Sequence, residues 1–142
     1  MQKNIPLKIS LQSEYFDLQS GEKYDEISQK TTGCFQKRDD GYRLLYKDGS
    51  KESDIYTELI YCFEQNEIII KKKGDVECEL LFSKEKECSA LYRLSSFSFD
   101  AHIKTHELSS SIDESGGEIK LLYTINLGGQ EQKISMQIFA EA

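Results

Sequence analysis

Two histidines are the residues of this chain whose spacing most resembles a metal site. His102 and His106 are four residues apart, a spacing that on a helix would place both imidazoles on one face. The surrounding sequence alternates like a β-strand, in which four residues span about 13 Å, too far for one metal ion. We therefore expect exposed histidines, and we predict neither a metal site nor a cofactor.

Neighbouring carboxylates are the candidates for hydrolytic chemistry. A hydrolytic pair needs two carboxyl groups that face each other in different environments. Glu77 and Glu79 alternate with apolar residues and should point to water, whereas Asp39-Asp40 and Asp113-Glu114 fall in turns. The sequence also lacks a Gly-x-Ser-x-Gly nucleophile motif and a glycine-rich phosphate loop that leads into a helix. It therefore predicts a protein that is not an enzyme.

Tyrosines form the most suggestive set of side chains for binding. Tyr46, Tyr61 and Tyr123 share the inward parity of their predicted strands, so each would bring a hydroxyl into an apolar interior. Arg93, beside Tyr92 near a strand end, could close such a site with a charge. These five residues are the candidate ligand-binding residues. The same pattern also fits a packed core whose tyrosine hydroxyls reach backbone or solvent at the rim of a barrel.

Composition and charge narrow the classes of partner. The chain has 142 residues and a formal net charge of -7 at pH 7, so nucleic acid would be repelled. The basic run Lys71-Lys72-Lys73 is followed by Glu77 and Glu79, and we expect it to be a solvated strand end rather than an anion site. No apolar stretch has the length of a signal peptide or a membrane span. The sequence therefore predicts a cytoplasmic protein without nucleic-acid or membrane contacts.

Apolar and polar positions alternate with a period of two along the chain, which predicts β-strands. The alternation is clear in Ile5 to Leu11, Tyr42 to Tyr46, Val76 to Phe82 and Ile119 to Ile125. We predict eight or more antiparallel strands in a single domain over residues 1–142. Closing the sheet removes its exposed edges, so the prediction is an all-β, up-and-down barrel rather than a two-layer sandwich.

The alternation also predicts turns and one irregularity. A two-residue turn at Gly128-Gly129 would set Tyr123 opposite Ile134, so that apolar faces meet. The apolar parity changes within residues 97–112. One extra residue near Thr105 to Glu107 would explain the change, and we predict a β-bulge there.

The turn around Gly74 is harder to place from the sequence. A two-residue turn would set a lysine opposite Cys78, whereas a three-residue loop Lys73-Gly74-Asp75 would set Ile70 opposite Cys78. The same loop would set Ile68 opposite Leu80. Because the longer loop keeps apolar residues on one face, we predict the longer loop.

Several short pieces of the chain form a pattern through their order and spacing. They are Thr32-Gly33 followed by Phe35, Tyr46, Lys73-Gly74-Asp75-Val76 running into Leu81-Phe82, Tyr92, Thr105, and Gly117 through Leu122-Tyr123. In this pattern, over about Ile5 to Ile138, the chain resembles the YwiB-like family, a domain of unknown function from Gram-positive bacteria. The chain departs from the family at the lysine before the hairpin glycine and at Leu94-Ser95-Ser96-Phe97. The resemblance implies a calycin-like (lipocalin-like) β-barrel and implies no reaction.

The inward tyrosines and the implied barrel together favour a protein that binds a small apolar or amphipathic ligand in its interior. The alternative is a protein-interaction or scaffolding module that works through an outer face of the sheet. Leu81, Leu122 and Phe139 have outward parity and are too apolar for fully solvated positions. Neither interpretation identifies the ligand or the partner.

Overall fold

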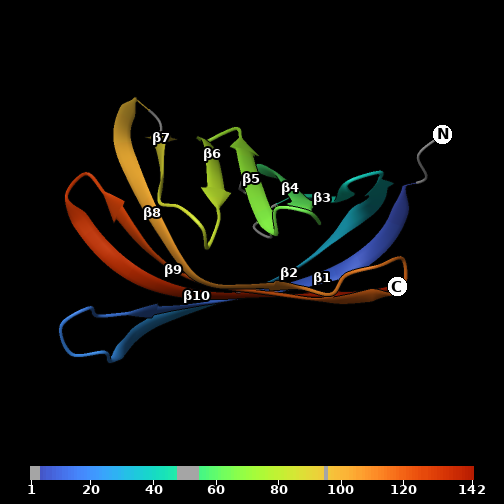
Figure 1. Cartoon of the computed structure of the whole chain (residues 1–142), viewed down its shortest axis with the longest axis horizontal. Coiled ribbons are helices and arrows are strands. Elements are labelled where there is room, and N and C mark those ends of the chain that lie inside the picture. The colour runs from blue at the N-terminus through green and yellow to red at the C-terminus, as the bar shows by residue number, and fades with distance from the viewer. Residues whose placement is uncertain (1–3, 48–54, 95) are drawn as a thin grey trace.

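The computed structural model describes residues 4–47, 55–94 and 96–142, which fold into ten β-strands joined by turns. The strands are β1 (Ile5–Phe16), β2 (Lys23–Arg38), β3 (Gly41–Lys47), β4 (Tyr56–Cys62), β5 (Glu67–Lys73), β6 (Val76–Phe82), β7 (Cys88–Leu94), β8 (Phe97–Ser110), β9 (Gly116–Leu127) and β10 (Gln130–Glu141). Each strand pairs antiparallel with the next, and β1 pairs with β10, so the sheet closes (Figure 1). The predicted all-β antiparallel barrel is confirmed. No helix in the described residues is long and apolar enough to cross a membrane.

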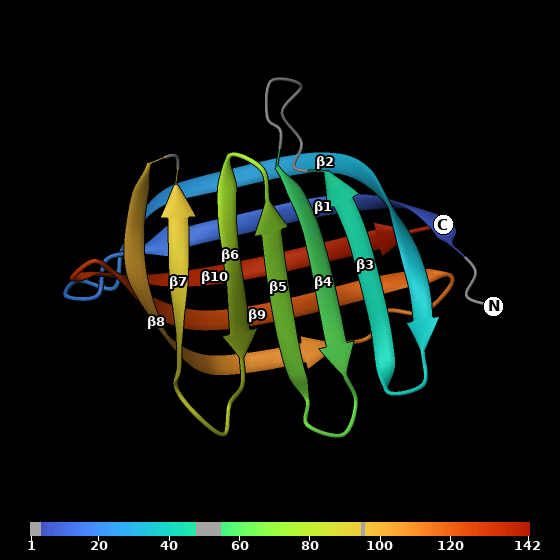
Figure 2. The same ribbon diagram turned by 90° about the horizontal axis from the view of Figure 1, so that it is seen from above.

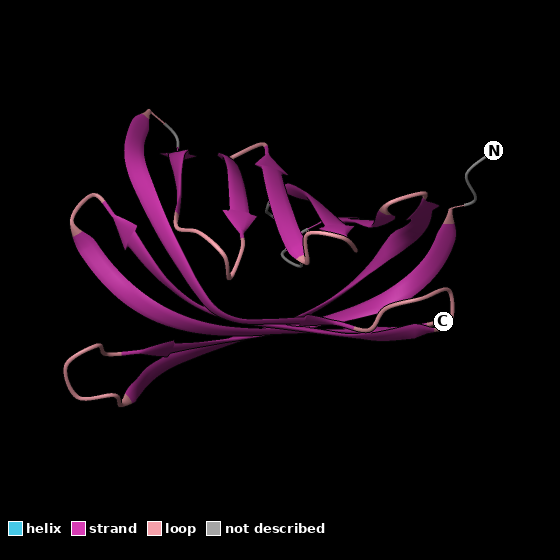
Figure 3. Ribbon diagram, in the orientation of Figure 1, coloured by secondary structure: helices cyan, strands magenta, loops and turns pink. Residues whose placement is uncertain are grey.

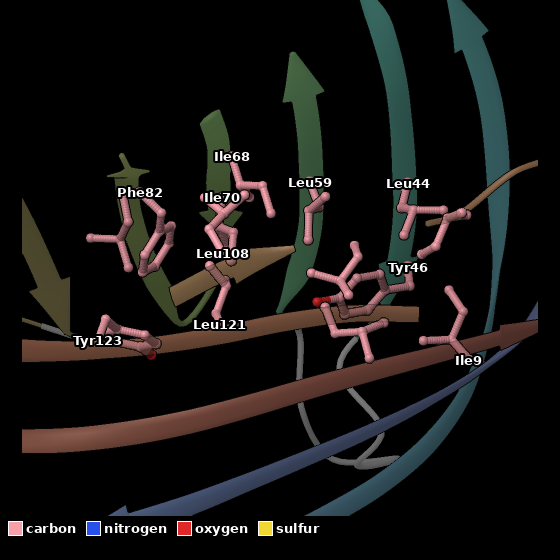
Figure 4. Close-up of a cluster of buried hydrophobic side chains, with 14 of the residues drawn as sticks. Ile9, Leu44, Tyr46, Leu59, Ile68, Ile70, Phe82, Leu108, Leu121 and Tyr123 are labelled. Carbon is pink, nitrogen blue, oxygen red and sulfur yellow. The ribbon is translucent and has the colours of Figure 1, made fainter. Parts of the chain in front are cut away.

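Alternation along each strand fills the interior of the barrel. In β1, Leu7 and Ile9 are buried while Lys8 between them is exposed. In β9, Ile119, Leu121 and other odd-numbered residues face inward in the same way. Full burial of such a side chain stabilises the fold by about 1.5–3 kcal/mol. Figure 4 shows part of this cluster, to which strands from both sides of the barrel contribute.

The strands differ in length, which gives the barrel two unlike walls. Strands β3 to β7 have 7 residues each, whereas β1, β2, β8, β9 and β10 have between 12 and 16. The long strands form one curved layer, over which the short strands lie (Figures 1 and 3). Seen from above, the long strands extend past the short ones at the end with the β1–β2 and β9–β10 turns (Figure 2).

Two local predictions are confirmed by the register. Tyr123 lies opposite Ile134 in the β9–β10 hairpin. The register between β8 and β9 shifts between Thr105 and Glu107, as expected for a β-bulge. Because of this shift, the inward positions of β8 change from odd to even numbers, and Leu108 is buried.

The predicted register of the β5–β6 hairpin was wrong. Ile70 lies opposite Leu80 rather than Cys78, and Ile68 lies opposite Phe82 rather than Leu80. Alternation fixes the face on which a residue lies, but a slip of two residues keeps every side chain on its face. The observed register sets the fully buried Phe82 ring beside Ile68, which is also fully buried.

The ladder between β6 and β7 is much shorter than the ladder between β1 and β2. Within the described residues, Val76, Glu77 and Cys78 pair with Leu94, Arg93 and Tyr92, which makes three pairs. The β1–β2 ladder has twelve pairs. Among the described residues, the β6–β7 seam is therefore the ladder with the fewest paired residues.

Gly33 lies on the inner face of β2, opposite Leu7 on one side and Tyr46 on the other. A β-carbon at this position would lie 2.4 Å from the Leu45 carbonyl oxygen and 2.7 Å from Ile9 Cδ1. No real β-carbon tolerates such a contact with backbone. The strand can pass this point because residue 33 has no side chain.

We predict that Gly33→Ala destabilises the barrel by about 1–3 kcal/mol, because the methyl group forces β2 away from β3. Ser28→Ala on the exposed face of the same strand is the control, and we expect it to change stability by less than about 0.5 kcal/mol. Urea denaturation followed by circular dichroism measures both values. Equal stability of the two variants would contradict the steric argument.

We also predict that amides facing the β6–β7 seam, within residues 79–82 and 88–91, exchange their hydrogens faster than amides of the β1–β2 ladder. The short ladder lets the seam open without global unfolding. Native-state hydrogen exchange followed by NMR measures this difference. Uniform protection along β6 and β7, at the level of β1, would show that the seam is as tight as the rest of the barrel.

Candidate functional site

A cavity of about 370 Å³ lies inside the barrel. Side chains from β1, β2, β3, β5, β6, β7, β9 and β10 line it. Its lining includes Tyr15 and Ile27, which lie toward the β1–β2 turn, and Leu127, which lies next to the β9–β10 turn. The cavity therefore lies toward the end at which the long strands project. Its volume is within the range of about 300–1,000 Å³ that is typical of small-molecule sites.

The cavity wall is amphipathic. Phe82, Ile70 and Ile125 are buried and give the wall an apolar part. Half-buried polar side chains, among them Gln29 and Gln132, form the rest. Such a wall suits a molecule that has an apolar body and at least one polar group.

Three of the predicted residues, Tyr46, Tyr92 and Tyr123, line this cavity. Tyr46 is near the end of β3, where it lies opposite Gly33 on β2 and Thr57 on β4. Because Gly33 has no side chain, the tyrosine can pack closely against β2. Figure 4 shows the side chains of Tyr46 and Tyr123 pointing toward each other from opposite sides of the buried cluster.

Tyr123 is strongly perturbed by its burial. Its side chain is 8 % exposed, and its ring packs edge-on against Phe82 with the ring centroids 4.8 Å apart. Burial raises the pKa of Tyr123 above its ordinary value near 10, and the nearby Tyr15 and Tyr92 raise it further. Tyr123 lines the cavity, so its hydroxyl is a hydrogen-bond donor for a ligand that supplies an acceptor.

Two predicted residues do not line the cavity. The Tyr61 ring faces inward at the opposite end of the barrel, 5.4 Å from the Tyr42 ring centroid, and its hydroxyl donates to Asn66 Oδ1 at 2.8 Å. Arg93 points outward, with Nη1 3.4 Å from Glu77 Oε2 across the β6–β7 seam. Arg93 follows an inward-facing tyrosine, so strand alternation itself places it outside, and the expectation that it closes the site was wrong.

Lys72 is a site residue that the sequence interpretation missed. It has the same parity as the buried Ile70, lines the cavity, and donates from Nζ to Thr57 Oγ1 at 3.3 Å. Its neighbour Lys71 faces outward, with Nζ 4.0 Å from Glu79 Oε1. The expectation of a wholly solvated lysine run was therefore wrong for its middle residue. The alternation of β5 was the signal that could have identified it.

A serine, a histidine and a glutamate lie in contact on the outer face of the barrel. His102 Nε2 is 2.8 Å from Glu87 Oε2, and His102 Nδ1 is 3.3 Å from Ser89 Oγ. The residue types are those of a nucleophilic triad, but the two imidazole nitrogens have exchanged partners relative to the serine protease arrangement. All three side chains are exposed, and the backbone N–H groups of the adjacent Gly128 and Gly129 already donate to other acceptors. Without free donors for an oxyanion, the contacts describe a surface network rather than an active site.

The two histidines do not share a site. His106 Nε2 lies 2.8 Å from Thr124 Oγ1, whereas His102 contacts the glutamate and serine just described. Within residues 4–47, 55–94 and 96–142, no group of three or more histidine, cysteine, aspartate or glutamate side chains could hold a metal ion.

The outward apolar residues also have defined places. Leu81 is half-buried and lies opposite Ile69, which in turn lies opposite Ile60, so a row of three apolar side chains crosses the outer face of β4, β5 and β6. Leu122 is half-buried on β9, and Phe139 on β10 is 40 % exposed. These residues form no single patch across the barrel.

Comparison with known proteins gives two findings. A family model described as DUF1934, a domain of unknown function, matches residues 9–138. The crystal structure of the ywiB protein from Bacillus subtilis is similar in fold, with a TM-score of 0.85, 21% sequence identity, and coverage of 99% of this chain and 94% of that chain. No curated protein matches the chain. The resemblance indicated by the short sequence pieces is confirmed.

We predict that Tyr123→Phe makes the stability of the barrel less sensitive to alkaline pH. Since the pKa of Tyr123 is raised, the folded protein keeps a proton that the unfolded chain loses near pH 10. The buried tyrosine therefore contributes its full stabilisation below about pH 10. Above that pH the free energy of unfolding falls, by up to about 1.4 kcal/mol per pH unit for each tyrosine with a raised pKa. Urea denaturation at several pH values above 10 should give a shallower fall for Tyr123→Phe. Tyr24→Phe, at an exposed tyrosine, is the control, and equal slopes in both variants would contradict the prediction.

Proposed function

Because the chain belongs to the DUF1934 family of unknown function, its role must be inferred from the barrel itself, and we propose that it binds a small apolar or amphipathic ligand in the interior cavity. In this proposal the protein is a cytoplasmic, non-catalytic binding protein. Strands β1 to β10 form the closed barrel, and the interior cavity is the ligand-binding site. The ligand replaces water at the polar part of the wall and packs against the apolar part.

The observation that carries this proposal is the Tyr123 hydroxyl inside a cavity of about 370 Å³. In a packed core side chains would fill the space beside Tyr123, whereas here the residue lines a cavity within the size range of small-molecule sites. Tyr46 and Tyr92 line the same space, so a ligand has several hydroxyls within one wall.

The second candidate function is a protein-interaction module that uses the outer face. The row Ile60, Ile69 and Leu81 is the observation that favours it. Ile60 is buried and the other two are half-buried, which leaves little apolar area for a partner. We therefore rank interior binding first.

We predict that a neutral apolar fluorophore, N-phenyl-1-naphthylamine, binds the barrel saturably at one site. Met136→Trp places a large ring in the cavity and should weaken this binding at least about tenfold. Gln137→Trp adds the same ring to the outward neighbour and should leave the affinity unchanged. Fluorescence titration measures both, and circular dichroism checks that each variant is folded.

Two results would contradict interior binding. One is equal binding of the fluorophore to both tryptophan variants, which would place it on the outer surface. The other is no binding to the wild-type barrel. If the protein is in addition a dimer by light scattering, the outer-face module becomes the better account.

A further inference from the structure

We propose that the ligand is a long-chain amphiphile, whose apolar chain extends out of the cavity and covers three exposed apolar side chains beside it. These are Leu94 at the end of β7 and Phe97 and Phe99 at the start of β8, and together they are called the apolar lip. This inference rests on the proposed binding function and specifies the class and the length of the ligand.

The inward face of β8 becomes exposed in steps as the strand leaves the core. Ala101 is 1 % exposed, whereas Phe99 is 38 % exposed and Phe97 is 66 % exposed. These three residues have the same parity, so they lie on one face of the strand. Leu94, which lies opposite Phe97 on β7, is exposed as well. A cluster of large apolar side chains that faces the inside of the barrel and yet meets solvent indicates a surface for an apolar group.

The lip continues the wall of the cavity. Phe99 lies opposite Tyr92, which lines the cavity. The next inward pair along the same two strands is Leu94 with Phe97. Successive inward pairs are about 7 Å apart along a strand. An apolar chain that lies in the cavity beside Tyr92 therefore reaches the outer part of the lip after about 7 Å.

Phe99 also connects the lip to β9. A β-carbon at Gly128 would lie 3.0 Å from Phe99 Cδ1, so the Phe99 ring packs against the β9–β10 turn. Gly128 follows Leu127, which lines the cavity, and its N–H donates to the Asp100 carbonyl oxygen at 3.3 Å. Figure 1 shows the start of β8 at the same end of the barrel as this turn. The lip and the cavity thus share one end of the barrel.

The size of the lip favours a ligand chain over a protein partner. From their exposed fractions, its three side chains present on the order of 300 Å² of apolar surface. A stable protein interface buries about 800 Å² on each partner. The cavity volume of about 370 Å³ is near the lower end of the range for small-molecule sites, so a long chain extends beyond it. The lip is the apolar surface that this outer part of the chain meets first.

A series of 1-alkanols from octanol to tetradecanol tests the inference, because these probes differ in chain length and carry no charge. Each is used below its solubility limit to displace N-phenyl-1-naphthylamine from the wild-type protein. We expect the affinity to rise about two- to fourfold with each added methylene group along the whole series, since each further group loses contact with water.

Phe97→Ser removes the outermost ring of the lip, so the rise in affinity should stop at a shorter chain. We expect this variant to weaken the binding of tetradecanol at least about fivefold more than the binding of octanol. Leu91→Ser is the matched control, because Leu91 is a similarly exposed apolar residue of β7 with outward parity. The control should leave the whole series unchanged, and circular dichroism checks that both variants are folded.

Three results would overturn the role of the lip. They are an unchanged affinity of Phe97→Ser for tetradecanol, an equal loss for octanol and tetradecanol, and the same selective loss in Leu91→Ser. A wild-type dimer that Phe97→Ser converts to a monomer in light scattering would also overturn it, because a second copy would then cover the lip. In all these cases interior binding stands as long as the fluorophore binds the wild-type barrel. If the fluorophore does not bind, the proposed function fails as well.

Discussion

The alternation of side chains around a closed sheet is the constraint on which the rest of this structure depends. Every second residue must face the interior, and because β1 pairs with β10, no strand can turn its inner face to solvent without opening the barrel. The interior is therefore filled by a set of residues that parity alone determines. Lys72 is inside for the same reason that Ile70 is inside.

The cavity follows from two departures from a uniform barrel. The long strands project past the short ones, and side chains from this projecting part, such as Ile27 and Leu127, line the cavity. Gly33 lets β2 approach β3 closely and positions Tyr46 at the wall. A barrel with ten strands of one length and a side chain at residue 33 would have a different interior. The site is thus a product of strand length and of one glycine.

The sequence was sufficient to predict the strands, the Gly128-Gly129 hairpin and the bulge near Thr105. Each of them either follows or interrupts the alternation of apolar and polar residues. The sequence was not sufficient for the β5–β6 register, because a slip of two residues leaves that alternation unchanged. For the site, parity placed Tyr46 and Tyr123 inside correctly. Arg93 and Lys72 were misassigned where charge and neighbouring residues were given more weight than parity. The division of the inward tyrosines between the cavity and the far end depends on strand lengths, which no local pattern shows.

The three-pair seam between β6 and β7 also bears on how this protein avoids association with its own copies. If the seam parts, two strand edges become available to the β-strands of another molecule, which is a common start of aggregation. Those edges carry Glu77 and Glu79 on one strand and Arg93 on the other. Charged side chains beside a free edge oppose the approach of a second apolar strand. Glu77 and Arg93, which form an ion pair across the closed seam, would thus hinder the addition of a foreign strand when the seam opens.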